Sequence, residues 1–218
     1  MKVNAQYLSQ LRKVMKEHQI DAVVINSTDP HQSENSPAHW RGREWLTGFW
    51  SENGTNGTVV VTENEALCWT DSRYFIQAET QLKDTGFTMM PEDGPEKVDL
   101  IDWLTEHTNK GETVGIDGMT FSIAMAQRLE QELGDNGVRL ETGFDVFDYI
   151  YPDRPVRPKN KLFVHDEEIV GETVDSKMGR LMKEVKGNLA NAVLLSALDD
   201  IAWATNLRTA GDIAFSPI

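Results

Sequence analysis

The chain has little cysteine, a deficit of positive charge and no long apolar run. Cys68 is the one cysteine in 218 residues, so an internal disulfide is excluded, and its apolar neighbours predict a buried, inert thiol. The net charge of −14 predicts no nucleic-acid or membrane partner, because phosphates would be repelled. No run approaches the roughly 18 apolar residues that cross a bilayer, and no signal segment is visible, so we expect a cytoplasmic protein.

The sequence also lacks the familiar catalytic motifs. It has no G-x-S-x-G elbow, no P-loop and no H-E-x-x-H pair among its five histidines. His31 and His39 share one loop, where solvated side chains are more usual than metal ligands. The glycine-rich stretch 48–57 precedes a strand instead of a helix, so reversing turns explain it better than a phosphate site. We therefore predict no catalytic residue and no metal ligand in this chain.

What is present is an alternation of apolar runs and amphipathic segments. The runs predict strands at 22–25, 58–62, 66–69, 87–90, 114–116 and 138–140. The amphipathic segments predict a helix capped by Asn4, a helix after Thr70 or Asp71, a helix over 98–107 and a helix capped by Thr120. The short polar turn at 63–65 predicts a hairpin, which makes the sheet mixed. The sum is an α/β domain whose mixed sheet carries helices on both faces.

A proline-rich segment then interrupts the alternation. Tyr151–Pro158 holds three prolines with charges between them, which favours an extended connector. After it the pattern predicts a strand at 161–165, a helix capped by Asp175 or Ser176, a strand at 191–197 and a helix at 198–206. We expect a first domain over 1–150, a linker over 151–160 and the first part of a second domain over 161–218. The chain would then be the N-terminal portion of a longer protein.

The segment Trp69–Ala78 carries the most chemistry. A strand end runs into a helix there, which places the Asp71 carboxylate, the Arg73 guanidinium and the Tyr74 phenol at the lip of a sheet. A cation in the first helical turn is mildly disfavoured by the helix dipole, so Arg73 invites an explanation. In one interpretation Arg73 pairs with Asp71 or another carboxylate and braces the turn. In the other it binds a ligand.

Six ordered motifs make the chain resemble a known family. Trp69–Ala78 is similar to the WTDGRYFLQA signature of Xaa-Pro aminopeptidase, whose N-terminal domains are related to those of creatinase and prolidase. The other similar segments are Asp29–Glu34 (DxHxSEY), Arg43–Phe49 (RxxFxTGF), Gly54–Thr62 (GSAGTAIIT), Asp153–Pro158 (DRPxRP), and Leu198–Trp203 with Asn206–Arg208 (LDEIAW and NLRG). Together they cover nearly the whole chain.

The resemblance implies a creatinase/prolidase N-terminal domain, with its ribonuclease H-like motif, and the start of a second similar domain. It implies that the catalytic domain, with two divalent metal ions, usually manganese, lies beyond residue 218. The whole enzyme would release the N-terminal residue of peptides that have proline in second position, and it would be a homodimer. This chain alone would be inactive.

The resemblance also implies roles for individual residues. Arg73 occupies the place of the family's peptide-binding arginine, and Asp71 and Tyr74 would position it. Ser72 stands where the family has glycine, and Ser36–Trp40 replaces the family's shorter YIA stretch. Trp40, Trp45 and Trp50 could line the pocket wall, although partly buried loop anchors are the more usual role for such residues.

One alternative comes from a different functional class. Creatinase-like proteins exist in which the peptidase fold has lost its metals and serves as a module for binding peptides or proteins. The acidic composition would suit such a module. The signature around Arg73, the proline-rich linker and the second domain favour the aminopeptidase. Creatinase itself fits less well, since it has a single N-terminal domain.

Overall fold

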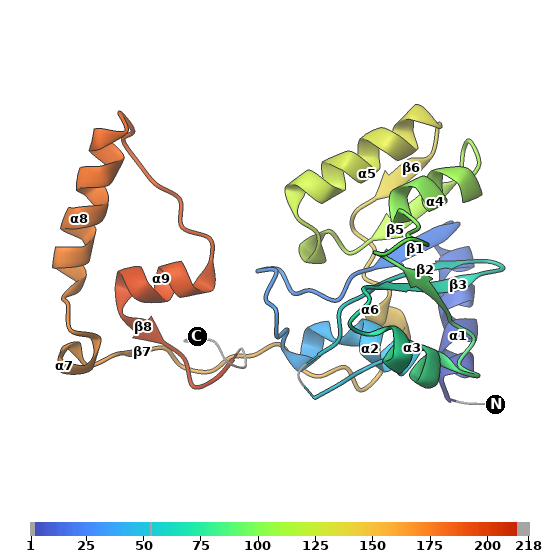
Figure 1. The fold of residues 1–218 in the computed structure, drawn as a ribbon, viewed down its shortest axis with the longest axis horizontal. Helices are drawn as coiled ribbons and strands as arrows, with labels where there is room; N and C mark the ends of the chain where they lie inside the picture. Colours follow the sequence, from blue (N-terminus) through green and yellow to red (C-terminus); the bar gives the residue numbers. More distant parts are fainter. Residues whose placement is uncertain (1–2, 53, 213–218) are drawn as a thin grey trace. The chain divides into compact units, whose positions relative to one another are not determined.

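The computed structural model describes residues 3–52 and 54–212. The chain divides into two compact units, Met1–Val156 and Arg157–Ile218. Figure 1 shows the elements of each unit along the sequence. None of the helices in the described ranges has the length and apolarity that a bilayer span requires.

A six-stranded mixed sheet forms the centre of the first unit. Its strands, in the order β4-β3-β2-β1-β5-β6, are β1 Ala22–Ile25, β2 Thr58–Thr62, β3 Ala66–Thr70, β4 Thr88–Pro91, β5 Thr113–Ile116 and β6 Arg139–Glu141. Strand β1 is antiparallel to β2 and parallel to β5. The antiparallel pairing of β2 with β3 confirms the predicted hairpin.

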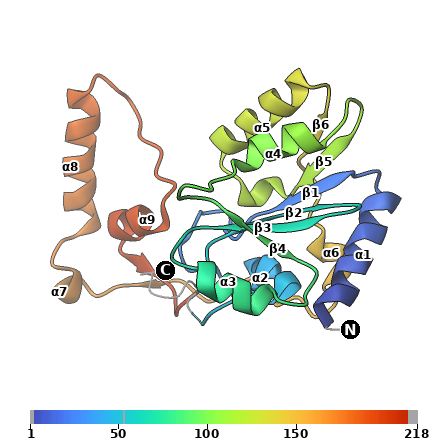
Figure 2. The ribbon, with the colours of Figure 1, turned by 45° about the vertical axis from the view of Figure 1, so that its right-hand side comes forward.

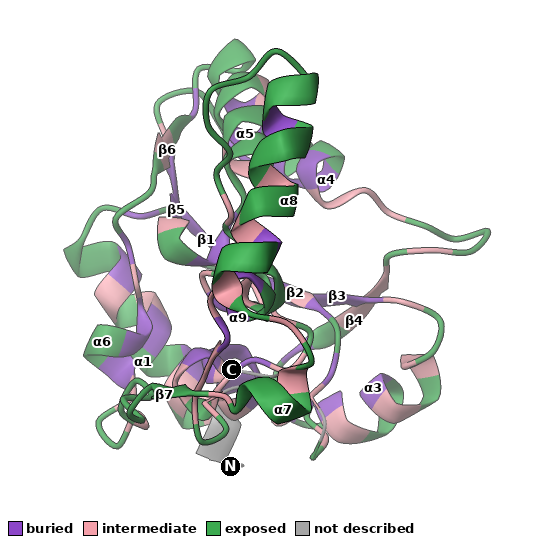
Figure 3. Ribbon diagram, turned by 90° about the vertical axis from the view of Figure 1, so that its left-hand side faces the viewer, coloured by how far each residue is buried: buried purple, intermediate pink, exposed green. Residues whose placement is uncertain are grey.

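Helices cover both faces of this sheet, as predicted (Figure 2). The helices of this unit are α1 Val3–Glu17, α2 Gly42–Thr47, α3 Phe75–Leu82, α4 Leu100–His107, α5 Ile123–Asp135 and α6 Phe147–Ile150. Successive side chains of β1 alternate between two cores. Val23 and Ile25 pack with α1, α2, α3 and α6. Ala22 and Val24 pack with α4 and α5. Figure 3 shows the buried strands between exposed outer helix faces.

Several predicted helix starts are wrong. Helix α1 already includes Asn4, which is therefore not its cap. Thr120 lies in the short 3₁₀-helix Gly118–Thr120, and Ser122 caps α5 because its side chain accepts a hydrogen bond from the Met125 amide. Neither Thr70 nor Asp71 caps α3, which begins at Phe75 after a turn. The short helices α2 and α6, of six and four residues, were not predicted, since they are too short for a periodic pattern.

The second unit contains helices α7 Glu167–Val170, α8 Val174–Gly187 and α9 Leu198–Thr205, with the short antiparallel strands β7 Phe163–Val164 and β8 Leu207–Arg208. Helix α9 confirms the predicted helix at 198–206. The cap of α8 is Thr173, whose side chain accepts a hydrogen bond from the Ser176 amide, so neither Asp175 nor Ser176 has that role. The predicted strand at 191–197 is wrong, because this segment forms no ladder with any described strand.

Candidate functional site

The candidate site is the turn between β3 and α3, residues 71–74. Asp71 Oδ1 accepts hydrogen bonds from Arg73 Nε at 2.7 Å and from the Arg73 backbone amide at 3.1 Å. Asp71 Oδ2 accepts from Arg73 Nη2 at 2.9 Å. The hydrogen bonds from Arg73 hold the pKa of Asp71 well below its ordinary value, and the same contact raises the pKa of Arg73. The predicted brace between these two residues therefore exists.

This ion pair leaves part of the Arg73 guanidinium available. Asp71 contacts the Nε and Nη2 side of the fork, and no described residue accepts a hydrogen bond from Nη1. The Arg73 side chain is 72% exposed, whereas that of Asp71 is 15% exposed. The outer edge, made of Nη1 and the second Nη2 hydrogen, is suited to a carbonyl or carboxylate oxygen.

The Tyr74 ring contacts the Arg73 guanidinium. The guanidinium carbon lies 5.4 Å from the centre of the Tyr74 ring, which favours a cation–π interaction. The ring also packs edge-on against Phe49, at 6.1 Å between centroids. Tyr74 is half-buried, so it links the exposed arginine to the core.

Three chain segments meet at this sheet edge. Because β2 is antiparallel to β3, the start of β2 lies beside the ends of β3 and β4. Asn56, just before β2, donates to Asp71 Oδ2 at 2.8 Å and to Glu92 Oε2 at 3.4 Å. Asp93, after β4, accepts from the Ser72 amide at 2.9 Å and from its hydroxyl at 3.0 Å. Sequence patterns gave no signal for Asn56, Glu92 or Asp93, because these contacts join distant segments.

Ser72 fits where the family signature has glycine. Ser72 is not one of the described non-glycine residues with a positive φ. The turn therefore does not need the left-handed conformation that glycine favours. The hydroxyl adds a hydrogen bond to Asp93 that glycine would lack. Serine at this position therefore leaves the local backbone unstrained.

The segment Asp29–Glu34 also approaches the site. Asp29 is buried, and its Oδ1 accepts from the amides of His31 and Ser33 at 2.9 and 3.0 Å, which fixes the loop. The Glu34 carboxylate is close enough to contribute to the raised pKa of Arg73. Two of the quoted motifs, far apart in sequence, therefore lie near enough for their charges to interact.

The histidines of the same loop differ in their surroundings. His31 is exposed, whereas His39 is half-buried and its Nδ1 lies 2.7 Å from the Pro155 carbonyl oxygen. In the described parts of the chain, no three or more His, Cys, Asp or Glu side chains gather in a way that could hold a metal ion.

The three tryptophans considered for the pocket wall, Trp40, Trp45 and Trp50, differ in how far they are buried. Trp40 is buried, and the Arg154 guanidinium lies 5.7 Å from its ring centre. Trp45 stacks on Tyr7 and on Tyr151, each at 4.0 Å. Trp50 is 55% exposed. Trp40 and Trp45 are thus anchors, and Trp50 has a face that a ligand could reach.

Buried polar groups lie beneath the site. Arg43 on α2 is fully buried, and burial lowers its pKa. Its Nη2 donates to the backbone oxygen of Thr55 at 2.7 Å and to the Thr55 hydroxyl at 2.6 Å. Cys68 is fully buried nearby, as predicted, and burial raises the pKa of its thiol.

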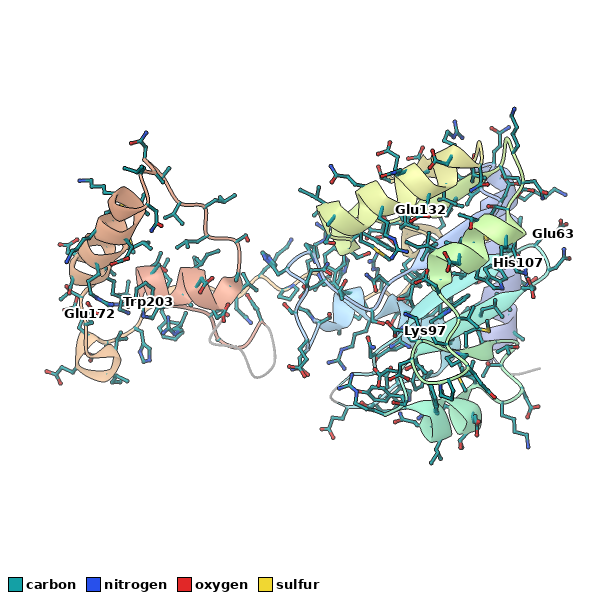
Figure 4. All side chains as sticks on the ribbon, turned by 45° about the horizontal axis from the view of Figure 1, so that its top comes forward. Glu63, Lys97, His107, Glu132, Glu172 and Trp203 are labelled. Carbon is teal, nitrogen blue, oxygen red and sulfur yellow. The ribbon has the colours of Figure 1, made fainter. Side chains whose placement is uncertain are left out.

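Of the hollows in the described part of the first unit, two bear on the question of a ligand site. One of about 270 Å³ adjoins the site, because Glu92 contributes to it together with Trp69 and Lys97. A larger groove, of about 710 Å³, is lined by Glu63 and His107 (Figure 4). The larger groove mixes acidic and basic side chains and contains none of the residues of the turn at 71–74.

Comparison with known proteins identifies the family. A sequence profile of the creatinase/prolidase N-terminal domain matches residues 8–144, and a second profile of the same description matches residues 153–218. The chain belongs to the creatinase/prolidase N-terminal domain family.

Individual relatives confirm the resemblance to Xaa-Pro aminopeptidases. Aminopeptidase P1 of Lotus japonicus is 35% identical over 214 residues, which cover 97% of this chain and 32% of the plant protein. A probable Xaa-Pro aminopeptidase P of Neosartorya fischeri is 36% identical over 215 residues, with the same coverage. The chain thus spans about a third of the length of these relatives.

A solved structure gives the same result for the fold. The crystal structure of X-prolyl aminopeptidase from Caenorhabditis elegans, described as a cytosolic enzyme with a di-nuclear active site, matches all of this chain and 36% of its own. The TM-score is 0.88 at 28% sequence identity. This agreement confirms the predicted fold class.

Proposed function

We propose that this chain is the N-terminal, non-catalytic part of a metal-dependent Xaa-Pro aminopeptidase, which releases the residue that precedes proline. The observation that carries the proposal is the fold similarity over the whole chain to the C. elegans enzyme, at a TM-score of 0.88. The relatives of 35% and 36% identity bear related names.

Within that enzyme, we assign Arg73 to peptide binding and Asp71 and Tyr74 to holding it. The support is geometric: one side of the guanidinium is fixed by Asp71, and its outer edge is exposed and has donors for a peptide oxygen. A binding role without participation in bond cleavage should appear in KM more than in kcat.

We further propose that residues 1–150 form the first domain, that 151–160 link it to the next, and that 161–218 begin the second domain. Arg154, near the start of this linker, binds residues of the proposed first domain. Its Nη1 donates to Asp145 and Asp148 at 2.6 and 3.0 Å, and its Nε donates to the His39 carbonyl at 3.1 Å.

The remaining proposals concern the whole enzyme. We propose two divalent metal ions, manganese by preference, held by the catalytic domain that the family resemblance implies outside residues 1–218. The di-nuclear active site of the C. elegans neighbour supports two metals. Activation of water by such metals is the chemistry that would cleave the Xaa-Pro bond. A cytoplasmic location and a homodimer complete the proposal.

The test is turnover of an Xaa-Pro tripeptide with manganese. Three samples are compared: the full-length protein, residues 1–218, and full-length Arg73→Ala, with Arg139→Ala as the matched control at an exposed arginine. We expect an active full-length protein, a silent fragment, and a KM raised about tenfold by R73A alone. A full-length protein that is inactive with every common divalent metal would favour a peptide- or protein-binding module instead.

A further inference from the structure

We propose that Asn56 is a positioning residue for Arg73 and acts through Asp71. The proposal rests on the peptide-binding role proposed above for Arg73. Asn56 is exposed and lies in the irregular segment just before β2, so its side chain needs no partner for the chain to fold. Its amide nevertheless lies on the carboxylate that holds the arginine.

The contacts form a short series. Asn56 Nδ2 donates to Asp71 Oδ2 at 2.8 Å, and the same oxygen accepts from Arg73 Nη2 at 2.9 Å. Oδ2 therefore lies between an amide and a guanidinium. The Arg73 side chain is mostly exposed, so the direction of its outer edge depends on how firmly the Asp71 carboxylate is oriented.

The position of Glu92 explains why residue 56 is a neutral hydrogen-bond donor, asparagine. The Asn56 amide also lies 3.4 Å from Glu92 Oε2, so it faces two carboxylates. Because one amide reaches both carboxylates, their like charges lie close together and repel one another. Partial burial and then the charges of Asp71 and Asp93 raise the pKa of Glu92 accordingly. An amide donor between Asp71 and Glu92 reduces that repulsion and keeps Asp71 turned toward Arg73.

The backbone of Asn56 is itself fixed. Its carbonyl oxygen accepts a hydrogen bond from the Thr70 hydroxyl at 2.7 Å, and Thr70 is fully buried. At the next residue, a Cβ added to Gly57 would lie 2.6 Å from the Trp69 carbonyl oxygen. The start of β2 is thus pressed against the end of β3, which brings Asn56 within reach of Asp71.

The preceding residue is anchored in the core. Glu44 Oε1 accepts from the Thr55 amide at 2.8 Å, and Arg43 donates to both oxygens of Thr55. Both α2 residues are buried. A continuous set of contacts therefore leads from α2 through Thr55 and Asn56 to the exposed arginine.

The test is a double-mutant cycle in the full-length enzyme, with KM and kcat measured on an Xaa-Pro tripeptide. The variants are Asn56→Ala, R73A and the double variant, with Asn64→Ala as control, since Asn64 is an exposed asparagine in the β2–β3 turn. We expect N56A to raise KM about threefold with kcat unchanged and to have no further effect once Arg73 is removed. Asn56→Asp should be worse than N56A, because it places a third carboxylate beside Asp71 and Glu92.

The other outcomes are distinguishable. If R73A raises KM but N56A does not, or if the two effects are additive, Asn56 does not act through Arg73 and the inference is wrong. If R73A itself leaves KM unchanged, the binding role of Arg73 fails, and the positioning role fails with it. Thermal unfolding of each variant separates a change in KM from a loss of folded protein.

Discussion

Lys177 and Asn206 form a buried hydrogen bond in the second unit, with 2.7 Å between the Lys177 ammonium and Asn206 Oδ1. The two residues are 3% and 1% exposed. Lys177 also donates to the Trp203 carbonyl at 2.9 Å, and Asn206 donates to the Glu172 carbonyl at 3.1 Å. This pair therefore joins α8 to the C-terminal end of α9, whose Trp203 is labelled in Figure 4.

Replacement of Lys177 by methionine should loosen this unit. The buried Asn206 Oδ1 and the partly buried Trp203 carbonyl would lose their charged donor, at a cost of about 2 kcal/mol. Hydrogen exchange of the α8 and α9 amides should become faster in Lys177→Met. Lys183→Met, at an exposed position of the same helix, is the matched control and should leave exchange unchanged. Equal protection in both variants would show that the ammonium contributes nothing to the packing.

Replacement of glycine by alanine should have opposite effects on stability at Gly57 and Gly134. A Cβ at Gly57 would meet the Trp69 carbonyl at 2.6 Å, whereas a Cβ at Gly134, in α5, meets nothing within 4 Å. Gly57→Ala should therefore lower the unfolding temperature, and Gly134→Ala should raise stability by about 0.5–1 kcal/mol through helix propensity. Differential scanning calorimetry of both variants measures the contrast. Stability unchanged by G57A would contradict the close approach of β2 to β3.

Arg43 should not tolerate lysine. A lysine ammonium cannot reproduce the planar fork that contacts Thr55 and the Phe49 carbonyl, and it would leave Glu44 poorly compensated. We expect Arg43→Lys to destabilise the first unit by about 3 kcal/mol, the scale of a broken buried charge contact. Urea unfolding checks this. The exposed Arg139→Lys should unfold at the wild-type urea concentration, and a similar midpoint for both variants would rule out an anchoring role.

The Asp71–Arg73 pair should survive mild acid. Because the folded pKa of Asp71 is lowered, the stability it contributes is complete above its unfolded pKa, about 3.9, and is lost only as pH falls through the lower folded value. A carboxyl-carbon NMR titration should find Asp71 still ionised at pH 4. In R73A the midpoint should return toward about 3.9. An ordinary midpoint in the wild-type protein would contradict the paired geometry.

Local patterns predicted the strongest elements because those elements bury what the pattern shows. All four residues of Ala22–Ile25 are buried, so an uninterrupted apolar run was a reliable sign of a central strand. The apolar content of 191–197 was misleading for the opposite reason. Leu194 is 90% exposed there, and a strand needs a neighbouring strand that no described residue provides.

At the candidate site, too, contacts between residues close in sequence were predictable and contacts between distant segments were not. Asp71 and Arg73 are two residues apart, so their pairing was among the interpretations open from sequence. Asn56 is fifteen residues from Asp71, and its contact depends on the register of β2 against β3. The register of β2 against β3 and the contacts from α2 depend on tertiary packing. That packing cannot be read from the sequence alone.

The place of β1 in the sheet has a consequence for the order of assembly. Ala22 pairs with Thr62 on one side and with Val114 on the other. During synthesis, β1 to β4 can pair once residue 91 has emerged, whereas the other edge of β1 stays open until β5 follows. Long-range pairing of this kind is slow, and an open apolar edge invites association with other chains. The interval between these two points of synthesis is when the nascent chain should depend most on chaperones.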